Sequence, residues 1–182
     1  MSDTFSPVFR AAGTADIDAV VTLVEAAYRG DSGRRGWTTE SDLLDGRRTD
    51  TAGVTELIGG PHSRVLLAEH DGVLRACCHV ACQDDSGYFG MFAVDPTLQG
   101  GGIGKAVLAE AERIVREEWR GRQMRMTVIV QRAELIAWYQ RRGYHRTGEY
   151  RPFPYGDERF GVPRRDDLRF EWLAKDLHRI PA

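Results

Sequence analysis

The sequence has 182 residues, of which 42% are hydrophobic and 29% charged, so the composition is ordinary for a globular protein and the length predicts one domain over residues 1–182. A net charge of −2 provides no overall field for binding nucleic acid or an anionic membrane surface. Neither a disulfide framework nor a metal-binding spacing is formed by the three cysteines, Cys77, Cys78 and Cys82, so we expect no metal. The sequence also lacks a signal-peptide pattern and an apolar run long enough to span a membrane. We therefore expect a cytoplasmic protein.

The chain begins with a predicted strand over residues 8–12 and a predicted helix over residues 14–29. Early acidic residues favour the start of this helix, and Gly30 ends it. Apolar residues at helical spacing mark its buried face: Ile17, Val20, Val21 and Val24.

The next thirty or so residues are the least regular part of the chain. A short helix capped by Thr38 or Thr39 is predicted to reach Leu44. A second helix is predicted to begin at Thr49 or Asp50 and to end at the Gly-Gly-Pro sequence that follows.

A β-hairpin is predicted next, with strands over residues 64–69 and 73–82. The Asp-Gly pair between them is a strong turn signal. In the second strand one face is predicted to carry the apolar residues Leu74, Ala76, Cys78 and Val80. The other face is predicted to carry Arg75, Cys77 and His79.

Residues 88–119 have the pattern of a strand, a tight loop and a helix. The apolar and aromatic run over 88–94 has the length of a strand, and Pro96 follows its end. Glu112 and Arg116 are predicted to form an i, i+4 ion pair on the outer face of the helix. Its inner face carries Ile103, Val107, Ala111 and Ile114.

Four glycines lie between this strand and this helix, so the amides at the helix N-terminus have no side chains in front of them. Such a place binds anions, especially diphosphates. The P-loop pattern fails because Gln99 and Ala106 occupy required positions, and the dinucleotide pattern fails at Lys105. The pattern Gln/Arg-x-x-Gly-x-Gly/Ala is met by Gln99-Gly-Gly-Gly-Ile-Gly104.

The C-terminal part is predicted to hold one helix and three strands. The helix over residues 134–142 carries Tyr139 and is closed by Gly143. An aromatic and proline-rich loop covers residues 151–163. The predicted strands cover residues 124–130, 144–150 and 167–175.

Two segments carry a family resemblance: Val94-Asp-Pro-Thr-Leu-Gln-Gly-Gly-Gly-Ile-Gly104 and Glu134-Leu-Ile-Ala-Trp-Tyr-Gln-Arg-Arg-Gly-Tyr144. Together, and in this order, they resemble the two signatures of the GCN5-related N-acetyltransferases (GNAT). The resemblance implies an α/β fold in which one mixed, mostly antiparallel sheet has helices on both faces. It also implies central strands that splay apart and admit the pantetheine arm of acetyl-CoA.

The resemblance also implies the binding and catalytic residues. The pantetheine arm would pair with the backbone of Phe92, Ala93 and Val94. Tyr139 would protonate the leaving thiolate, because a phenol keeps its proton at neutral pH; a core tyrosine is the alternative. The diphosphate would lie on the glycine loop and the helix start, where Lys105 would either add positive charge or remain solvated. The implied binding residues are Gln99, Gly100, Gly101, Gly102, Ile103, Gly104 and Lys105.

The general base and the acceptor stay open, and the acceptor is expected to be a primary amine of a small molecule or peptide. The alternative bases are Glu40, Glu56, His79 and Tyr88. Acidic residues suited to a cationic amine are Glu40, Asp42 and Asp45, whereas arginines suited to a carboxylate or phosphate are Arg34, Arg35, Arg47 and Arg48. Aromatic residues suited to a pocket wall are Trp37, Phe153, Tyr155 and Phe160.

Three classes of function follow from these patterns. The first is an acetyl-CoA-dependent N-acetyltransferase, monomeric or homodimeric, in which the amine attacks the thioester directly in a ternary complex. The second is a non-catalytic acyl-CoA-binding sensor on the same fold. The third is a nucleotide-binding protein that uses the glycine loop.

Overall fold

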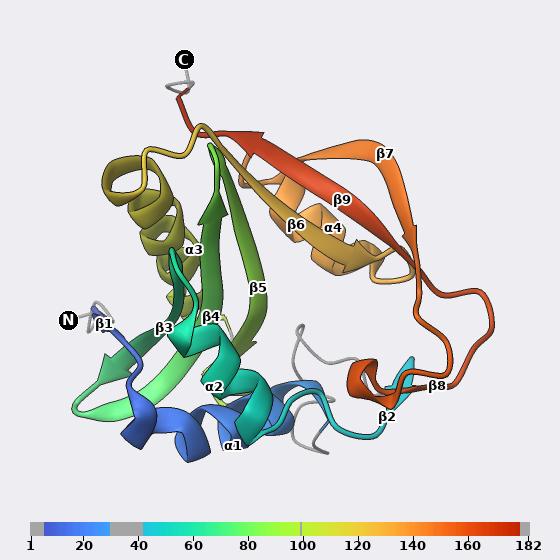
Figure 1. Cartoon of the computed structure of the whole chain (residues 1–182), viewed down its shortest axis with the longest axis horizontal. Coiled ribbons are helices and arrows are strands. Elements are labelled where there is room, and N and C mark those ends of the chain that lie inside the picture. Colours follow the sequence, from blue (N-terminus) through green and yellow to red (C-terminus); the bar gives the residue numbers. More distant parts are fainter. Residues whose placement is uncertain (1–5, 30–41, 99, 179–182) are drawn as a thin grey trace.

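A seven-stranded sheet forms the centre of the molecule, with helices on both faces (Figure 1). The computed structural model describes residues 6–29, 42–98 and 100–178. The strand order is β1-β3-β4-β5-β6-β9-β7, and neighbouring strands are antiparallel except for β5 and β6, which are parallel. The predicted mixed, mostly antiparallel sheet is therefore confirmed.

The elements fall into two groups along the chain. The first group is β1 (Val8–Ala11), η1 (Thr14–Asp16), α1 (Ile17–Tyr28), β2 (Leu44–Asp45), α2 (Thr51–Gly59), β3 (Ser63–His70), β4 (Val73–Gln83), β5 (Ser86–Val94), α3 (Ile103–Arg113) and the π-helical turn η3 (Ile114–Glu118). The second group is β6 (Gln123–Ile129), α4 (Ala133–Gln140), β7 (His145–Pro152), η4 (Glu158–Phe160), β8 (Val162–Pro163) and β9 (Arg169–Asp176).

The sheet is buried on both faces in its centre, and β4 contributes to two clusters. Ala76, Cys78 and Val80 pack toward α3 and α4, whereas Cys77 packs toward α1 and α2. Leu74 was predicted to share a face with Ala76, and this prediction is wrong. Ala68 pairs with Ala76 and Glu69 with Leu74, so Arg75 is the extra residue of a β-bulge and Leu74 turns to the other cluster.

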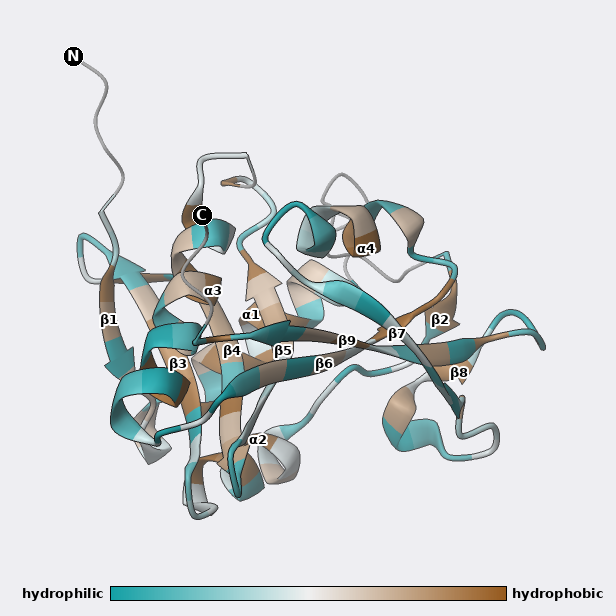
Figure 2. Cartoon of the chain, turned by 90° about the horizontal axis from the view of Figure 1, so that it is seen from above, coloured by the Kyte–Doolittle hydropathy of each residue, from teal (hydrophilic) through white to brown (hydrophobic). Residues whose placement is uncertain are grey.

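The two edges of the sheet differ from its centre. Strand β7 forms one edge, and seven of its eight residues are exposed while one is half-buried. Figure 2 shows this strand as largely hydrophilic, which is the ordinary way to keep a strand edge from pairing with another chain. None of the described helices is long and apolar enough to cross a membrane.

The central strands β5 and β6 separate soon after they meet. Their parallel ladder joins Ser86–Tyr88 to Gln123–Arg125. Beyond it, Met91 has a φ of 44°, and on β4 the pairing passes from His79–Gly90 to Cys77–Ala93, so β5 carries a bulge at residues 91–92. The bulge bends β5 away from β6, and the two ribbons diverge in Figure 1. The predicted splaying of the central strands is confirmed.

The predicted helix through Leu44 is not formed in the described part of that segment. Leu44–Asp45 pairs with Val162–Pro163 as a small antiparallel ladder, β2 with β8. Leu44 is buried against Ile129, Phe153 and Leu168, so a contact with a distant segment decides its conformation. The alternative caps Thr38 and Thr39 lie outside the described residues.

Two predicted helix ends are confirmed. Asp50 is the N-cap of α2, and its side chain accepts a hydrogen bond from Gly53 N at 2.8 Å. Gly143 follows α4 with a φ of 94°, the left-handed conformation that suits glycine after a helix.

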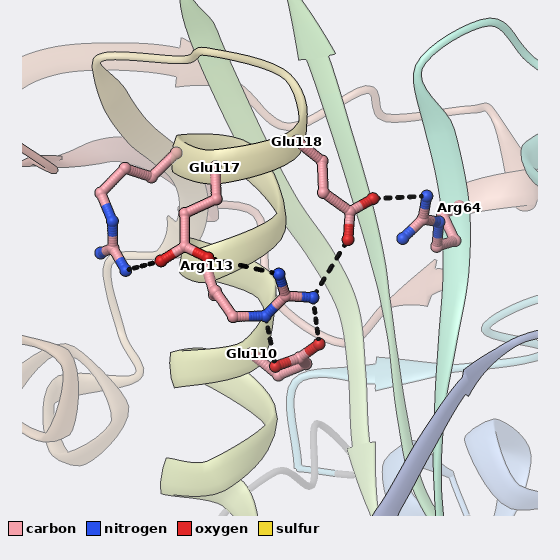
Figure 3. Close-up of polar contacts among 6 residues, drawn as sticks. Arg64, Glu110, Arg113, Glu117 and Glu118 are labelled. Carbon is pink, nitrogen blue, oxygen red and sulfur yellow. Dashed lines mark hydrogen bonds and ion pairs between the residues drawn. The ribbon is translucent and has the colours of Figure 1, made fainter.

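An ion-pair network joins the end of α3 to the sheet (Figure 3). Arg113 contacts Glu110 at 2.7 Å and Glu118 at 3.0 Å, and Glu118 contacts Arg64 of β3 at 3.0 Å. Each pair is partly exposed and contributes about 0–1 kcal/mol alone. Together they connect the π-helical turn to β3.

The predicted pair between Glu112 and Arg116 is wrong. Arg116 contacts Glu117 at 3.1 Å instead. Glu112 is only 9% exposed; it accepts hydrogen bonds from Tyr144 Oη at 2.8 Å and from Lys175 Nζ at 3.0 Å. Glu112 therefore pairs with Tyr144 and Lys175, which are distant in the sequence, and not with Arg116 on its own helix.

Candidate active site

The loop between β5 and α3 begins with a turn organised by Asp95. Its carboxylate accepts hydrogen bonds from Thr97 N at 3.0 Å and Thr97 Oγ1 at 2.7 Å, and it contacts Arg75 Nη1 at 3.3 Å. Leu98 N donates to Asp95 O at 2.9 Å. These bonds fix where the chain leaves the strand and approaches the helix.

The glycines after this turn place bare backbone at the N-terminus of α3. Gly102 is the N-cap, with a φ of 83°, and the first helical bond runs from Ala106 N to Gly102 O at 3.1 Å. The amides of residues 103–105 precede that bond and point out of the helix end. A Cβ added at Gly100 or Gly102 would meet no atom within 4 Å, so open space lies in front of the backbone.

A cavity of about 550 Å³ extends from this helix end to α4. Six predicted residues line it: Val94, Gly100, Gly102, Ile103, Gly104 and Lys105. Gly101 is not among the lining residues, because its amide turns into the loop and donates to Leu98 O at 3.3 Å. Gln99 lies outside the described residues.

Helix α4 supplies lining residues that the sequence analysis did not assign to the site. Trp138, Arg141 and Arg142 line the same cavity as the glycine loop. The Arg142 guanidinium lies 3.6 Å from the Trp138 ring centroid, and Arg142 Nη1 donates to Trp138 O at 2.8 Å. The signal was present in the sequence as the two consecutive arginines that precede Gly143 in the second signature.

Residues 92–94 lie where β5 and β6 have separated. The side chains of Phe92, Ala93 and Val94 are buried at 3%, 0% and 0% exposure, so any contact with a ligand would use the backbone. The ladder with β6 ends at Tyr88 and Arg125, before these residues. Val94 lines the first cavity and Phe92 lines a second one, so residues two apart on β5 reach both cavities.

The second cavity has a volume of about 430 Å³, and Tyr139 lines it. Tyr139 is 4% exposed and makes edge contacts with Phe89 at 6.3 Å and Tyr144 at 5.8 Å between ring centroids. Burial raises the pKa of its phenol well above the usual value. The phenol is therefore protonated at neutral pH and can donate a proton or a hydrogen bond.

His79 lines this cavity with a defined tautomer. Ser63 Oγ donates to Leu57 O at 2.7 Å, so the 2.8 Å contact between Ser63 Oγ and His79 Nε2 has the histidine as donor. Nδ1 is then the acceptor nitrogen. Burial lowers the pKa of His79 to about 4, so the ring is neutral at pH 7.

Tyr88 lies beside His79, at 5.8 Å between ring centroids, and also lines the second cavity. Its phenol covers Gly90, because a Cβ there would lie 2.8 Å from Tyr88 Oη. Gly90 thus makes room for a ring at the cavity wall. In the sequence, the sign of this close approach was a lone glycine, Gly90, inside a strand pattern.

Some of the remaining candidate bases and acceptor residues line the second cavity and others do not. Of the alternative bases, Glu56, His79 and Tyr88 line the second cavity, whereas Glu40 lies outside the described residues. Tyr155 does not line it, because its hydroxyl is engaged with Leu168 N at 2.8 Å and Arg165 O at 3.1 Å. The predicted residues that line it are Arg48, Phe153 and Phe160.

The other acceptor candidates among the described residues do not line this cavity. Asp42, Asp45 and Arg47 are exposed and absent from its walls, and Asp45 contacts Arg164 at 3.4 Å. Arg34, Arg35 and Trp37 lie outside the described residues. Among the described residues, no group of three His, Cys, Asp or Glu side chains is arranged to hold a metal ion.

A known family model matches the part of the chain that carries the glycine loop and α4. Residues 61–146 match the model of the Acetyltransferase (GNAT) domain. No curated protein matches the sequence.

Solved structures share the fold at low sequence identity. The ribosomal-protein-S18-alanine N-acetyltransferase of Escherichia coli superposes with a TM-score of 0.70 at 16% identity, covering 97% of both chains. The acetyltransferase yncA of Salmonella typhimurium, solved with its cofactor acetyl-CoA, gives 0.66 at 19% identity, with 97% of both chains covered. A chimera of the spermidine N-acetyltransferase SpeG of Vibrio cholerae and hSSAT gives 0.67 at 14% identity, covering 94% of this chain and 95% of that one.

The matched residues run from the start of β3 to the start of β7 and include the glycine loop, the separated strands and α4. The sequence match to the GNAT acetyltransferase domain covers residues 61–146, and the whole chain shares the fold of the N-acetyltransferases named above.

Proposed function

We propose that this protein transfers the acetyl group of acetyl-CoA to a primary amine. One observation carries the proposal: a helix N-terminus with bare backbone lines one cavity, a buried tyrosine lines a second, and neighbouring residues of β5, Val94 and Phe92, line the first and the second. The amides of Gly102, Ile103 and Gly104 suit the diphosphate, and Lys105, Arg141 and Arg142 add positive charge around it. The gap suits the pantetheine arm, whose amides pair with backbone at Phe92, Ala93 and Val94.

The chemistry follows from the second cavity. The lone pair of the neutral amine attacks the thioester carbonyl carbon, and the carbon–sulfur bond then breaks. The Tyr139 phenol donates a proton to the leaving thiolate. The amine loses its own proton through His79 Nδ1, Glu56 or a water held by them, since these groups line the same cavity.

The test is a thiol-release assay with acetyl-CoA and a panel of amines. We expect free CoA to appear only when a suitable amine is present, together with the acetylated amine by mass spectrometry. CoA binding without thiol release across the whole panel would favour the acyl-CoA-binding sensor. Thermal stabilisation by ATP but not by CoA would favour the nucleotide-binding alternative.

Tyr139→Phe tests the proton donor. Because only the hydroxyl is removed, we expect kcat to fall roughly 100-fold, as for loss of a general acid, with CoA affinity unchanged. The matched control is Tyr150→Phe, since Tyr150 is 47% exposed on the edge strand β7. An unchanged kcat in Tyr139→Phe would reassign this tyrosine to packing.

A further inference from the structure

The end of α2 leaves the carbonyl of Leu57 without an α-helical donor. This carbonyl is one of the last four of the helix, and the residue four positions later is Pro61, which has no amide hydrogen. Ser63 Oγ supplies a donor instead, at 2.7 Å from Leu57 O. Because a serine hydroxyl has a single hydrogen, the oxygen of Ser63 can then only accept from any further partner.

The further partner of this serine is His79. Its Nε2 lies 2.8 Å from Ser63 Oγ and must donate, so the lone pair of the ring is on Nδ1. None of the described residues donates a hydrogen bond to Nδ1, and Nδ1 is not one of the side-chain atoms that are buried without a partner. The acceptor nitrogen of His79 is therefore accessible on a ring that lines the second cavity.

Aromatic packing holds the imidazole ring in place as well. The ring lies 5.8 Å from the Tyr88 ring centroid, and Tyr88 meets Trp172 edge-on at 6.3 Å. Gly90 pairs with His79 across the sheet and makes room for the Tyr88 ring. Glu56 lines the same cavity, but its side chain is exposed and no hydrogen bond fixes its carboxylate. Of these two candidate bases, only His79 has a fixed position.

His79 and Tyr139 reach the second cavity from opposite faces of the sheet. His79 shares its face of β4 with Cys77, which packs toward α1 and α2. Tyr139 belongs to the cluster of α3 and α4. Both residues line the cavity together with Met91 and Phe92 of the β5 bulge. A group bound in this cavity therefore has a proton acceptor on one side of the sheet and a proton donor on the other.

We propose, on the basis of the proposed function, that His79 Nδ1 takes the proton of the attacking amine and that Ser63 is its positioning residue. As the amine nitrogen bonds to the carbonyl carbon, its N–H becomes acidic and the proton passes to Nδ1. The carbon–sulfur bond breaks, and the thiolate takes the proton of Tyr139. The imidazolium then releases its proton to water, and the Tyr139 phenolate takes one from water. Because burial lowers the pKa of His79 to about 4, the ring begins each cycle neutral and releases the proton readily.

Nitrogen NMR of the full-length protein with labelled histidine tests the positioning role without turnover. The chemical shifts of the two ring nitrogens tell the protonated nitrogen from the unprotonated one, and the signals of His79 are those that disappear in His79→Gln. At neutral pH we expect a single tautomer, protonated at Nε2, in the wild type and in Ser63→Thr, which keeps the hydroxyl. In Ser63→Ala we expect a mixture of both tautomers. An unchanged single tautomer in Ser63→Ala would overturn the role of Ser63.

Kinetics test the proton transfer, with acetyl-CoA and the amine of the panel that releases thiol fastest. His79→Gln keeps a donor for Ser63 but cannot take a proton, so we expect kcat to fall roughly 100-fold with CoA affinity unchanged. Ser63→Ala should show a smaller fall, which Ser63→Thr reverses. His79→Ala leaves a space of the size of an imidazole ring, and added imidazole should restore part of kcat. The matched control is His145→Ala, at an exposed histidine of β7, which should behave as the wild type with and without imidazole.

These outcomes separate this inference from the proposed function. An undiminished kcat in His79→Gln would overturn this inference, while thiol release by the wild type would leave acetyl transfer standing. Loss of activity in Glu56→Gln alone would assign the proton to Glu56, with the same consequence. CoA binding and thermal unfolding of each variant establish that it is folded; should His79→Ala not fold, His79→Gln and the tautomer in Ser63→Ala still decide. Absence of thiol release with every amine would overturn both.

Discussion

At the scale of single residues, His79 shows how burial can fix a protonation state. Its Nε2 hydrogen is committed to Ser63, and burial lowers its pKa to about 4. The unfolded chain keeps an ordinary histidine pKa of about 6.5. Above pH 6.5 both states are neutral at this residue, so it makes no pH-dependent contribution there. Between pH 6.5 and 4 the unfolded state binds a proton that the folded state does not, so stability falls as the pH falls.

This difference in pKa between the folded and unfolded states predicts that His79 makes the unfolding free energy sensitive to acid. Between pH 6.5 and 4, the unfolding free energy of the wild type is expected to fall by roughly 3 kcal/mol more than that of His79→Gln. Urea unfolding at several pH values measures it, and His145→Gln, at an exposed histidine of β7, is the control. Parallel pH profiles for wild type and His79→Gln would contradict it.

Residue roles were only partly predictable from the sequence. Gly100, Gly102, Gly104 and Tyr139 were assigned by the resemblance, and the lining of the two cavities supports them as proposals, whereas Gly101 does not line either cavity. Ser63 and Gly90 were not assigned, because their roles depend on which side chains the fold places beside them. Glu112 was assigned to the wrong partner for the same reason.

At the scale of elements, the start of α3 combines a left-handed glycine with exposed amides. The Gly102 φ of 83° is costly for any residue with a Cβ, by about 1–2 kcal/mol. The space in front of it is nevertheless open. Backbone strain and charge can therefore be separated by comparing two substitutions at this one position.

Gly102→Ala and Gly102→Asp make that comparison. Both should lose similar stability, because both place a Cβ on a left-handed residue. Only Gly102→Asp adds a carboxylate beside the proposed diphosphate site, so its CoA affinity is expected to be at least roughly 10-fold weaker than that of Gly102→Ala. Calorimetric titration with CoA measures both; equal affinities would mean that the diphosphate does not lie on this loop.

The order and type of the long elements were predictable because their apolar periodicity is strong. The predicted strands and helices over residues 8–29 and 64–119 agree closely with the structure. The ladder between β2 and β8 was not predictable, since two-residue strands carry no periodicity and depend on segments far apart in the sequence. The π-helical turn after α3 also leaves no pattern distinct from a helix.

At the scale of the whole molecule, two half-sheets are joined by a short ladder and by buried contacts. Helix α3, which carries Glu112, packs against β3, β4 and β5. The partners of Glu112, Lys175 on β9 and Tyr144 before β7, belong to the other half. Glu112 therefore connects the halves at the closed end of the gap, where β5 and β6 are still paired.

Removing this connection is expected to cost more than removing a surface pair. Glu112→Ala should lower the unfolding free energy by about 2–4 kcal/mol, because Lys175 loses a buried partner. Glu117→Ala, at a 53%-exposed side chain in the network of Figure 3, should cost no more than about 0.5 kcal/mol. Urea unfolding of both variants measures the difference, and equal losses would show that Glu112 does not join the halves.

The divergence of β5 from β6 has a consequence for inhibition. The site between β5 and β6 is proposed to bind the pantetheine arm, which is narrow and carries two amides. Any extended oligoamide of similar width could bind there in the same way. Such a compound would compete through main-chain bonding alone. A competitor for the proposed pantetheine site would therefore need neither an adenine ring nor phosphates, and uncharged peptidomimetics are a rational starting library.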